Sequence, residues 1–304
     1  MTNHSICLRA LAACGLFALL SCKHPPTATD WREQPVEPNK RFLIEIDGTS
    51  DTDIWALSND AVHHYDGARW DTTPISRRLR KVSVAGPNDV WFGGFMGRVV
   101  HYDGKTFEVS VIDFAEKNYW DVVTIAAWPG EVWVAFSQPG YFEKKGQGDW
   151  AYIDPPELAG WKVHTLWGKT KGDVWAGIER PGAAKVAHLQ NGKWTIFDRL
   201  QGFGFGGSAT NDVWFSGRTM VHWDGATLTD VPMPEHEGRI YGLAARSSSD
   251  ALAVGKNGLT WGWDGTKWNV LPKVTKNDLD RVFAAPHGHY HAISVGSVWV
   301  KTTP

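Results

Sequence analysis

The sequence has few cysteines, no long apolar run and no large net charge. Each of these absences excludes a class of protein. Two of its three cysteines, Cys7 and Cys14, lie in the first 21 residues, so only Cys22 follows and no disulfide framework is available. No stretch reaches the ~20 apolar residues of a membrane-spanning helix. With 31 Lys and Arg against 33 Asp and Glu, the net charge is −2, which does not favour binding to nucleic acid.

The N-terminal segment has the pattern of an export signal. Arg9 precedes a short apolar run that ends in Leu19-Leu20-Ser21-Cys22. The tetrapeptide resembles the lipobox of bacterial lipoproteins, which implies cleavage before Cys22 and lipidation of its thiol. The alternative is an ordinary signal cleaved nearby, with Cys22 left as a free thiol. We therefore expect a lipoprotein signal peptide over residues 1–21, a tether over 22–29 and a single domain over 30–304.

The rest of the chain repeats two short phrases about every 40 residues. One phrase is an acidic residue, an apolar residue and Trp, and it begins at Asp53, Asp89, Glu131, Asp173 and Asp212, with a degenerate copy at Asp250. The other is an aromatic residue followed by Asp-Gly, as in Tyr65-Asp66-Gly67, Tyr102-Asp103-Gly104, Trp223-Asp224-Gly225 and Trp263-Asp264-Gly265, with Asn191-Gly192 as a variant. The Asp-Gly pairs predict hairpins with type I′ turns. Such a period, without helical periodicity, indicates a β-propeller.

Each repeat divides into four short strands, and the chain contains seven innermost strands. We expect these strands at residues 42–46, 82–85, 122–126, 163–167, 203–207, 240–244 and 282–285. The seventh repeat stops after its third strand. Residues Trp31 to Pro35 have the pattern of an outermost strand, which begins with an aromatic residue and runs to Pro, as in Trp70 to Pro74. The sequence therefore predicts an all-β, seven-bladed propeller of four-stranded antiparallel blades, in which the N-terminal strand completes the last blade. The Trp, Asp and His residues that recur with the repeat, including His64, His101, His188 and His222, have structural roles in this interpretation.

The two phrases together, Asp-Val-Trp followed by His-Tyr/Trp-Asp-Gly, resemble the repeats of secreted bacterial seven-bladed β-propeller lipoproteins. The resemblance covers nearly all of residues 31–301 and implies the fold, whereas the family implies little about function. The Asp-Gly-x-x-Trp end also partly resembles the Asp-box of sialidases, which is itself structural. Lys23, after the lipobox cysteine, resembles the pattern of sorting to the outer membrane. We therefore expect a lipid-anchored protein of the bacterial cell envelope, at the outer membrane.

Departures from the repeat are the places to seek chemistry. His287, His289 and His291 alternate in one segment, but a turn is expected within it and no carboxylate lies nearby in sequence, so we expect no metal site. Glu and Tyr residues in loops between blades are not grouped by sequence. No phosphate-binding loop or nucleophile motif is present. We therefore expect neither a cofactor nor a catalytic residue.

Basic residues recur on the face where the innermost strands begin. They are Arg41, Lys81, Lys162, Arg239 and Arg281 at the strand starts, and Arg98, Arg180, Arg218 and Lys256 in the loops of the same face. This pattern predicts a basic face that binds an envelope protein or an anionic polysaccharide. The alternative is that strand ends are simply polar and that their charges neutralise one another. The sequence thus favours a monomeric, non-enzymatic binding or scaffold module. A glycan hydrolase or lyase, with its site at the central mouth, is the second hypothesis.

Overall fold

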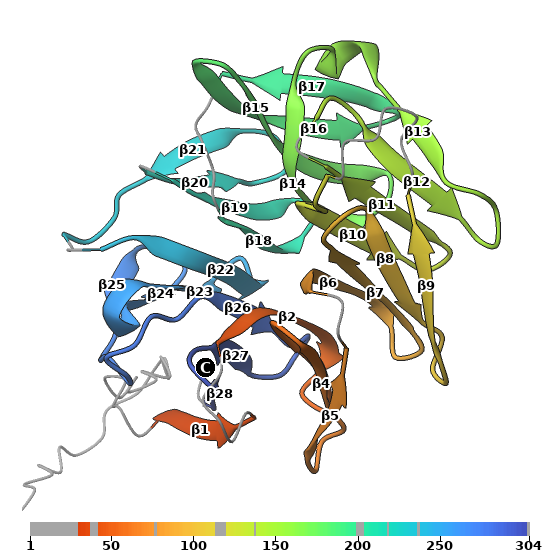
Figure 1. Cartoon of the computed structure of the whole chain (residues 1–304). Coiled ribbons are helices and arrows are strands. Elements are labelled where there is room, and N and C mark those ends of the chain that lie inside the picture. Colours follow the sequence, from red (N-terminus) through yellow and green to blue (C-terminus); the bar gives the residue numbers. More distant parts are fainter. Residues whose placement is uncertain are drawn as a thin grey trace, which may run out of the picture.

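Seven four-stranded antiparallel sheets are arranged as blades around a central axis, in the order of the chain (Figure 1). The computed structural model describes residues 30–36, 42–75, 78–112, 120–136, 138–198, 204–217, 219–235 and 238–302. The predicted seven-bladed propeller is confirmed. The predicted signal peptide and tether, with Cys22, lie outside the described residues.

Each blade is built from strands that are consecutive in sequence, except at the closure. The innermost strands are β2 (Leu43–Ser50), β6 (Leu79–Gly86), β10 (Thr124–Trp128), β14 (Lys162–Thr170), β18 (Gly204–Ala209), β22 (Ile240–Ser247) and β26 (Arg281–Ala284). The second strands are β3 (Asp53–Ser58), β7 (Asp89–Gly94), β11 (Glu131–Ala135), β15 (Asp173–Arg180), β19 (Asp212–Ser216), β23 (Asp250–Gly255) and β27 (Tyr290–Ile293). The third strands are β4 (Ala61–Tyr65), β8 (Arg98–Tyr102), β12 (Tyr141–Lys145), β16 (Ala183–Gln190), β20 (Met220–Trp223), β24 (Thr260–Trp263) and β28 (Ser297–Lys301). The outermost strands are β5 (Trp70–Pro74), β9 (Phe107–Val111), β13 (Ala151–Ile153), β17 (Lys193–Phe197), β21 (Leu228–Val231), β25 (Trp268–Val270) and β1 (Trp31–Pro35).

The N-terminal strand completes the seventh blade, as predicted. Strand β1 pairs with β28 in antiparallel register from Trp31 opposite Lys301 to Pro35 opposite Ser297 (Figure 1). Oγ of Ser297 also donates a 2.7 Å hydrogen bond to Oε1 of Glu33. The pairing leaves no three-stranded blade with an open edge.

Helical structure is slight in the described chain. It includes two 3-10 helices, η2 (Pro156–Leu158) and η3 (Lys256–Gly258). No helix among the described residues is long and apolar enough to cross a membrane.

In the first two blades a polar triad of Asp, Trp and His explains the acidic-apolar-Trp phrase. In the first blade, Oδ1 of Asp53 accepts hydrogen bonds from Nε1 of Trp55 at 3.1 Å and from His64 Nε2 at 2.9 Å. The His64 ring stacks on the Trp55 indole with centroids 4.0 Å apart. The same stacking recurs in three more blades, as Trp91 on His101, Trp175 on His188 and Trp214 on His222. The structural role predicted for these residues is confirmed, and the carboxylates fulfil it by accepting hydrogen bonds from side chains.

The Asp-Gly hairpins turn differently from the prediction. In four of them only the glycine has a positive φ, for example +93° at Gly67, so the type I′ prediction is wrong there. Oδ1 of Asp66 accepts the backbone N–H groups of Ala68 and Arg69 at 2.8 and 2.9 Å, which stabilises a turn that needs left-handed backbone only at glycine. In the variant hairpin, Asn191 and Gly192 both have positive φ, 54° and 74°, as a type I′ turn requires.

Candidate functional site

The seven innermost strands enclose a central channel with a cavity of about 440 Å³. We call the face where these strands begin the upper face, and the face where they end the lower face. Innermost strands are sheet edges, with backbone N–H groups that have no partner within their own sheet. Side chains from the preceding blade accept three of them: Asp47 Oδ2 from Val84 at 2.8 Å, Ser83 Oγ from Ala127 at 3.0 Å and Thr124 Oγ1 from Leu166 at 3.0 Å.

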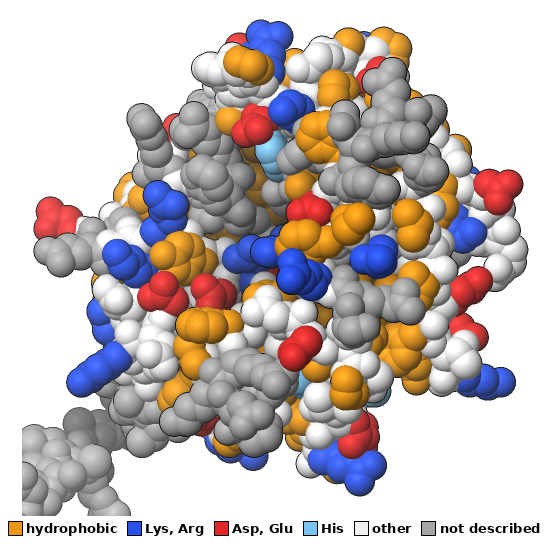
Figure 2. Space-filling model, in the orientation of Figure 1, with side chains coloured by type: hydrophobic (Ala, Val, Ile, Leu, Met, Phe, Trp, Pro, Cys, Tyr) orange, Lys and Arg blue, Asp and Glu red, His pale blue; other side chains and the backbone are white. Residues whose placement is uncertain are grey.

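One carboxylate lies between two cations in the upper part of the channel. Nζ of Lys81 lies 3.0 Å from Oε2 of Glu45, and Nε of Arg281 lies 3.2 Å from its Oε1. Arg281 also donates from Nη1 to the backbone oxygens of Tyr241 and Asp280. The group therefore carries one excess positive charge. Lys and Arg side chains also gather near the centre of the face that Figure 2 shows, with a few acidic side chains among them.

A second pair of opposite charges lines the channel near its lower end. Burial raises the pKa of Asp47 to about 6, although the Val84 N–H bond and Lys169 oppose the shift. Burial likewise lowers the pKa of Lys169, against the attraction of Asp47 and Asp212. Nζ of Lys169 forms no hydrogen bond or ion pair with any residue that the structure describes. The channel thus contains a cation that no described residue pairs with directly.

Seven of the nine predicted basic residues lie in the described part of the chain. Lys81 and Arg281 meet at Glu45 in the channel, and Arg239 and Lys256 lie together because Lys256 N donates to Arg239 O at 2.9 Å. The guanidinium of Arg180 stacks on the ring of Trp161, 4.3 Å from its centroid. Lys162 begins β14 and Arg98 begins β8, whereas Arg41 and Arg218 lie outside the described residues. The basic face as a binding site stays a prediction.

Sequence reasoning missed Glu45, Asp47 and Lys169. A signal exists in the register of the innermost strands. Asp47 pairs with Trp55 on the second strand of its blade. At the equivalent position the other blades have small or aromatic residues, so Asp47 is the single carboxylate of the set: Ser83, Ala126, Trp167, Gly206, Ala244 and Phe283.

The upper loops of the second blade carry an exposed apolar and arginine-rich surface. We define the blade 2 surface as Arg78, Arg80, Phe95, Met96, Arg98 and Trp120. The Arg80 guanidinium lies 4.4 Å from the centroid of the Phe95 ring. Met96 is 42% exposed and Trp120 is 38% exposed. The segments are joined by a 2.9 Å hydrogen bond from Gly97 N to Trp120 O, so the two exposed side chains belong to adjoining loops.

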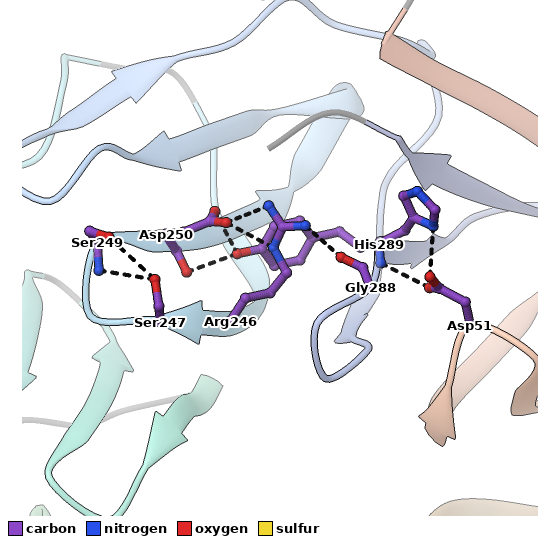
Figure 3. Close-up of polar contacts among 8 residues, drawn as sticks. Asp51, Arg246, Ser247, Ser249, Asp250, Gly288 and His289 are labelled. Atoms are coloured by element: carbon purple, nitrogen blue, oxygen red, sulfur yellow. Dashed lines mark hydrogen bonds and ion pairs between the residues drawn. The ribbon is translucent and has the colours of Figure 1, made fainter. Parts of the chain in front are cut away.

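The histidine-rich segment joins the seventh blade to the first. His289 Nδ1 and His291 Nε2 each lie 2.8 Å from an oxygen of Asp51, which comes from the first blade. The backbone N–H of His289 donates to the same carboxylate, and on the other side of the turn Nη1 of Arg246 donates to the backbone oxygen of Gly288 (Figure 3). In the described part of the chain, no group of three or more His, Cys, Asp or Glu side chains could hold a metal ion.

No protein-family model and no curated protein matches the chain. Solved propellers match its fold. YCF48 from Cyanidioschyzon merolae is 16% identical with a TM-score of 0.72, over 90% of this chain and 98% of that one, and YCF48 has also been solved bound to a D1 peptide. Virginiamycin B lyase from Staphylococcus aureus is 10% identical with a TM-score of 0.74, over 90% and 99% of the two chains.

The WD40 repeats of RRP9 match as well, with 9% identity and a TM-score of 0.72 over 91% of this chain and 98% of that one. These structures include a peptide-binding protein and an enzyme on the same fold. At such low identity the similarity shows the seven-bladed fold alone, and function has to be argued from the sites of this chain.

Proposed function

We propose that this protein is a monomeric binding or scaffold module of the bacterial cell envelope, anchored to the outer membrane by a lipid on Cys22. The module recognises a partner protein through its upper face. The blade 2 surface is the observation that carries this proposal. Met, Trp and Arg are enriched in the cores of protein interfaces, where large rigid side chains are buried and guanidinium groups form directed hydrogen bonds. This surface combines all three residue types in adjoining loops.

The chemistry of the surface defines its partner. Arg78 and Arg80 lie over the ring of Phe95, which precedes the exposed Met96, and Arg98 follows in the same segment. A segment with acidic side chains and one or two apolar anchors is therefore complementary to this surface. A polysaccharide offers anionic groups but lacks apolar anchors for Met96, and for this reason the geometry favours a protein. The similarity to a propeller solved with a bound peptide is compatible with this choice.

The channel carboxylates are the observation that favours the alternative, a glycan hydrolase or lyase at the central mouth. A carboxyl group with a pKa of about 6, such as that of Asp47, suits a general acid. However, Glu45 and Asp47 both belong to β2, on one wall of the channel, whereas glycosidases place two carboxyl groups on either side of the scissile bond. Lys81 and Arg281 also neutralise Glu45. The geometry therefore favours binding.

Site-specific photocrosslinking in intact cells tests the proposal. A photoreactive amino acid replaces Met96 in the full-length chain, and a control replaces Val270, which is 62% exposed on the outermost strand of the sixth blade. We expect an adduct of one defined mass from position 96, lost when Arg80→Glu and Trp120→Ser are added, and no such adduct from position 270. Equal adducts from both positions, or none from position 96, would contradict a partner at this surface.

A further inference from the structure

The central channel brings together a lysine, a partly exposed tryptophan and free volume. Its cavity of about 440 Å³ lies within the range of small-molecule sites, roughly 300–1,000 Å³. Among the described Lys and Arg side chains that line it, Lys169 alone has no carboxylate partner, because Lys81 and Arg281 share Glu45. A cation in a partly desolvated channel binds an anion more strongly than it would in bulk water.

Two tryptophans flank Lys169. Trp167, two residues earlier on β14, is partly exposed in the channel and packs against Gly207, where an added Cβ would lie 2.8 Å from the indole ring. On the other side, Trp128 Nε1 donates a 3.0 Å hydrogen bond to the backbone oxygen of Gly168. The absence of a side chain at Gly207 thus leaves room for the Trp167 indole at the channel, and the hydrogen bond holds Trp128 next to the residue that precedes Lys169.

The nearby acid does not complete an ion pair with this lysine. Asp47 Oδ2 accepts the N–H group of Val84 across the blade boundary, and no ion pair joins the Asp47 carboxylate to Lys169. Lys169 is exposed as a residue and lines the channel. Its three donors are therefore available to a ligand that enters the cavity.

We infer that the central channel binds a small organic carboxylate with a flat aromatic body, whose carboxylate pairs with Lys169 and whose ring lies against Trp167. The charge of Lys169 selects an anion, and the neighbouring Trp167 indole favours a planar apolar group over a hydrated inorganic ion. The site is lined by the innermost strands and is separate from the blade 2 surface, so this inference does not rest on the proposed function.

Calorimetric titration of the full-length chain with benzoate tests the inference, with benzamide as the neutral isostere. We expect saturable benzoate binding, and binding of benzamide at least about tenfold weaker, which corresponds to the loss of one charge-assisted hydrogen bond. Lys169→Met should weaken benzoate binding by a similar factor. Lys193→Met, on the exposed outermost strand of the same blade, should leave it unchanged. Equal benzoate affinity of Lys169→Met and the unaltered protein, or no benzoate binding to the unaltered protein, would overturn the site.

A second measurement needs no variant and so does not depend on the folding of one. Amine acylation of the unaltered protein, followed by peptide mass spectrometry, reports each lysine separately. We expect benzoate to slow the labelling of Lys169 severalfold without changing that of Lys193, and benzamide to protect neither residue. Labelling of Lys169 that benzoate does not alter contradicts the proposed contact, and so does equal protection by benzamide.

Discussion

Nε2 of His291 lies 2.8 Å from Oδ1 of Asp51, although 240 positions of the chain separate the two residues. Burial lowers the pKa of His291, although Asp51 opposes the shift, so the ring is neutral near pH 7 and donates from Nε2. Its Nδ1 atom is buried without a hydrogen-bond partner, which agrees with this tautomer. Although burial opposes it, hydrogen bonds from His291 and from the His289 backbone lower the pKa of Asp51 to about 2. One carboxylate of the first blade thus fixes the turn of the seventh.

We expect Asp51→Ala to lower the free energy of unfolding at pH 7 by about 1–3 kcal/mol, because it leaves a buried histidine and a backbone N–H group without their acceptor. The pKa of Asp51 is depressed in the folded state, so its contribution is present above the unfolded value and is lost as the pH falls through about 2. Chemical denaturation at pH 7 and at pH 3 should therefore show a smaller difference at pH 3. Asp71→Asn, at an exposed pair with Arg69, serves as the control and should change stability by less than about 0.5 kcal/mol. An Asp51→Ala variant as stable as this control would contradict the role.

Truncation tests the closure of the ring. Deleting residues 23–36 removes β1 and leaves the edge of β28 unpaired, so we expect a large fall in the melting temperature of the whole domain. Deleting residues 23–28 removes only chain that precedes β1, and we expect the melting temperature to stay the same. Both truncations are followed by circular dichroism during heating. Equal melting temperatures would show that the pairing of β1 with β28 contributes little.

The repeated phrases of the sequence predicted the strands, whereas they did not predict the contacts between blades. The seven innermost strands and the closure by Trp31 to Pro35 follow from hydrophobic pattern and repetition, which are local properties. By contrast, the contact of Asp51 with His291 depends on which blades the ring places side by side. The sharing of Glu45 by Lys81 and Arg281 depends in addition on the register of the innermost strands. The repeat also concealed the use of Asp53, because a carboxylate beside a turn has the same sequence signature whether it accepts from backbone or from an indole.

Asp47 provides a pH test of the channel. Its folded-state pKa of about 6 is raised above the unfolded value, so ionisation costs stability as the pH rises from about 4 through 6. Asp47→Asn keeps an oxygen for Val84 N–H and removes this cost. We expect the variant to be more stable than the unaltered protein by about 1–3 kcal/mol at pH 7.5, since one pKa unit corresponds to about 1.4 kcal/mol, and by less than about 1 kcal/mol at pH 4. Denaturation midpoints at the two pH values measure the difference, and a gain of equal size at both would contradict the assignment.

The lipid anchor is tested at Cys22. We expect Cys22→Ser to lose incorporation of a labelled fatty acid and to move from the membrane fraction to the soluble fraction, because a diacyl anchor binds a bilayer far more strongly than surface charge does. The unaltered chain, processed in the same cells, is the control. If the two proteins incorporate label and partition alike, the lipoprotein hypothesis fails.

The antiparallel pairing of β1 with β28 also determines how the domain responds to pulling. Trp31 lies opposite Lys301, and Pro35 lies opposite Ser297. Ser297 is the first residue of β28, the end at which the chain arrives from β27. A force applied to the chain before Trp31 therefore acts along the strand axis, away from the end at which β28 is held. In that direction the hydrogen bonds between the two strands are sheared together and do not open one after another. A tether attached at this end would pull on the ring in the geometry in which a pair of strands resists extension best.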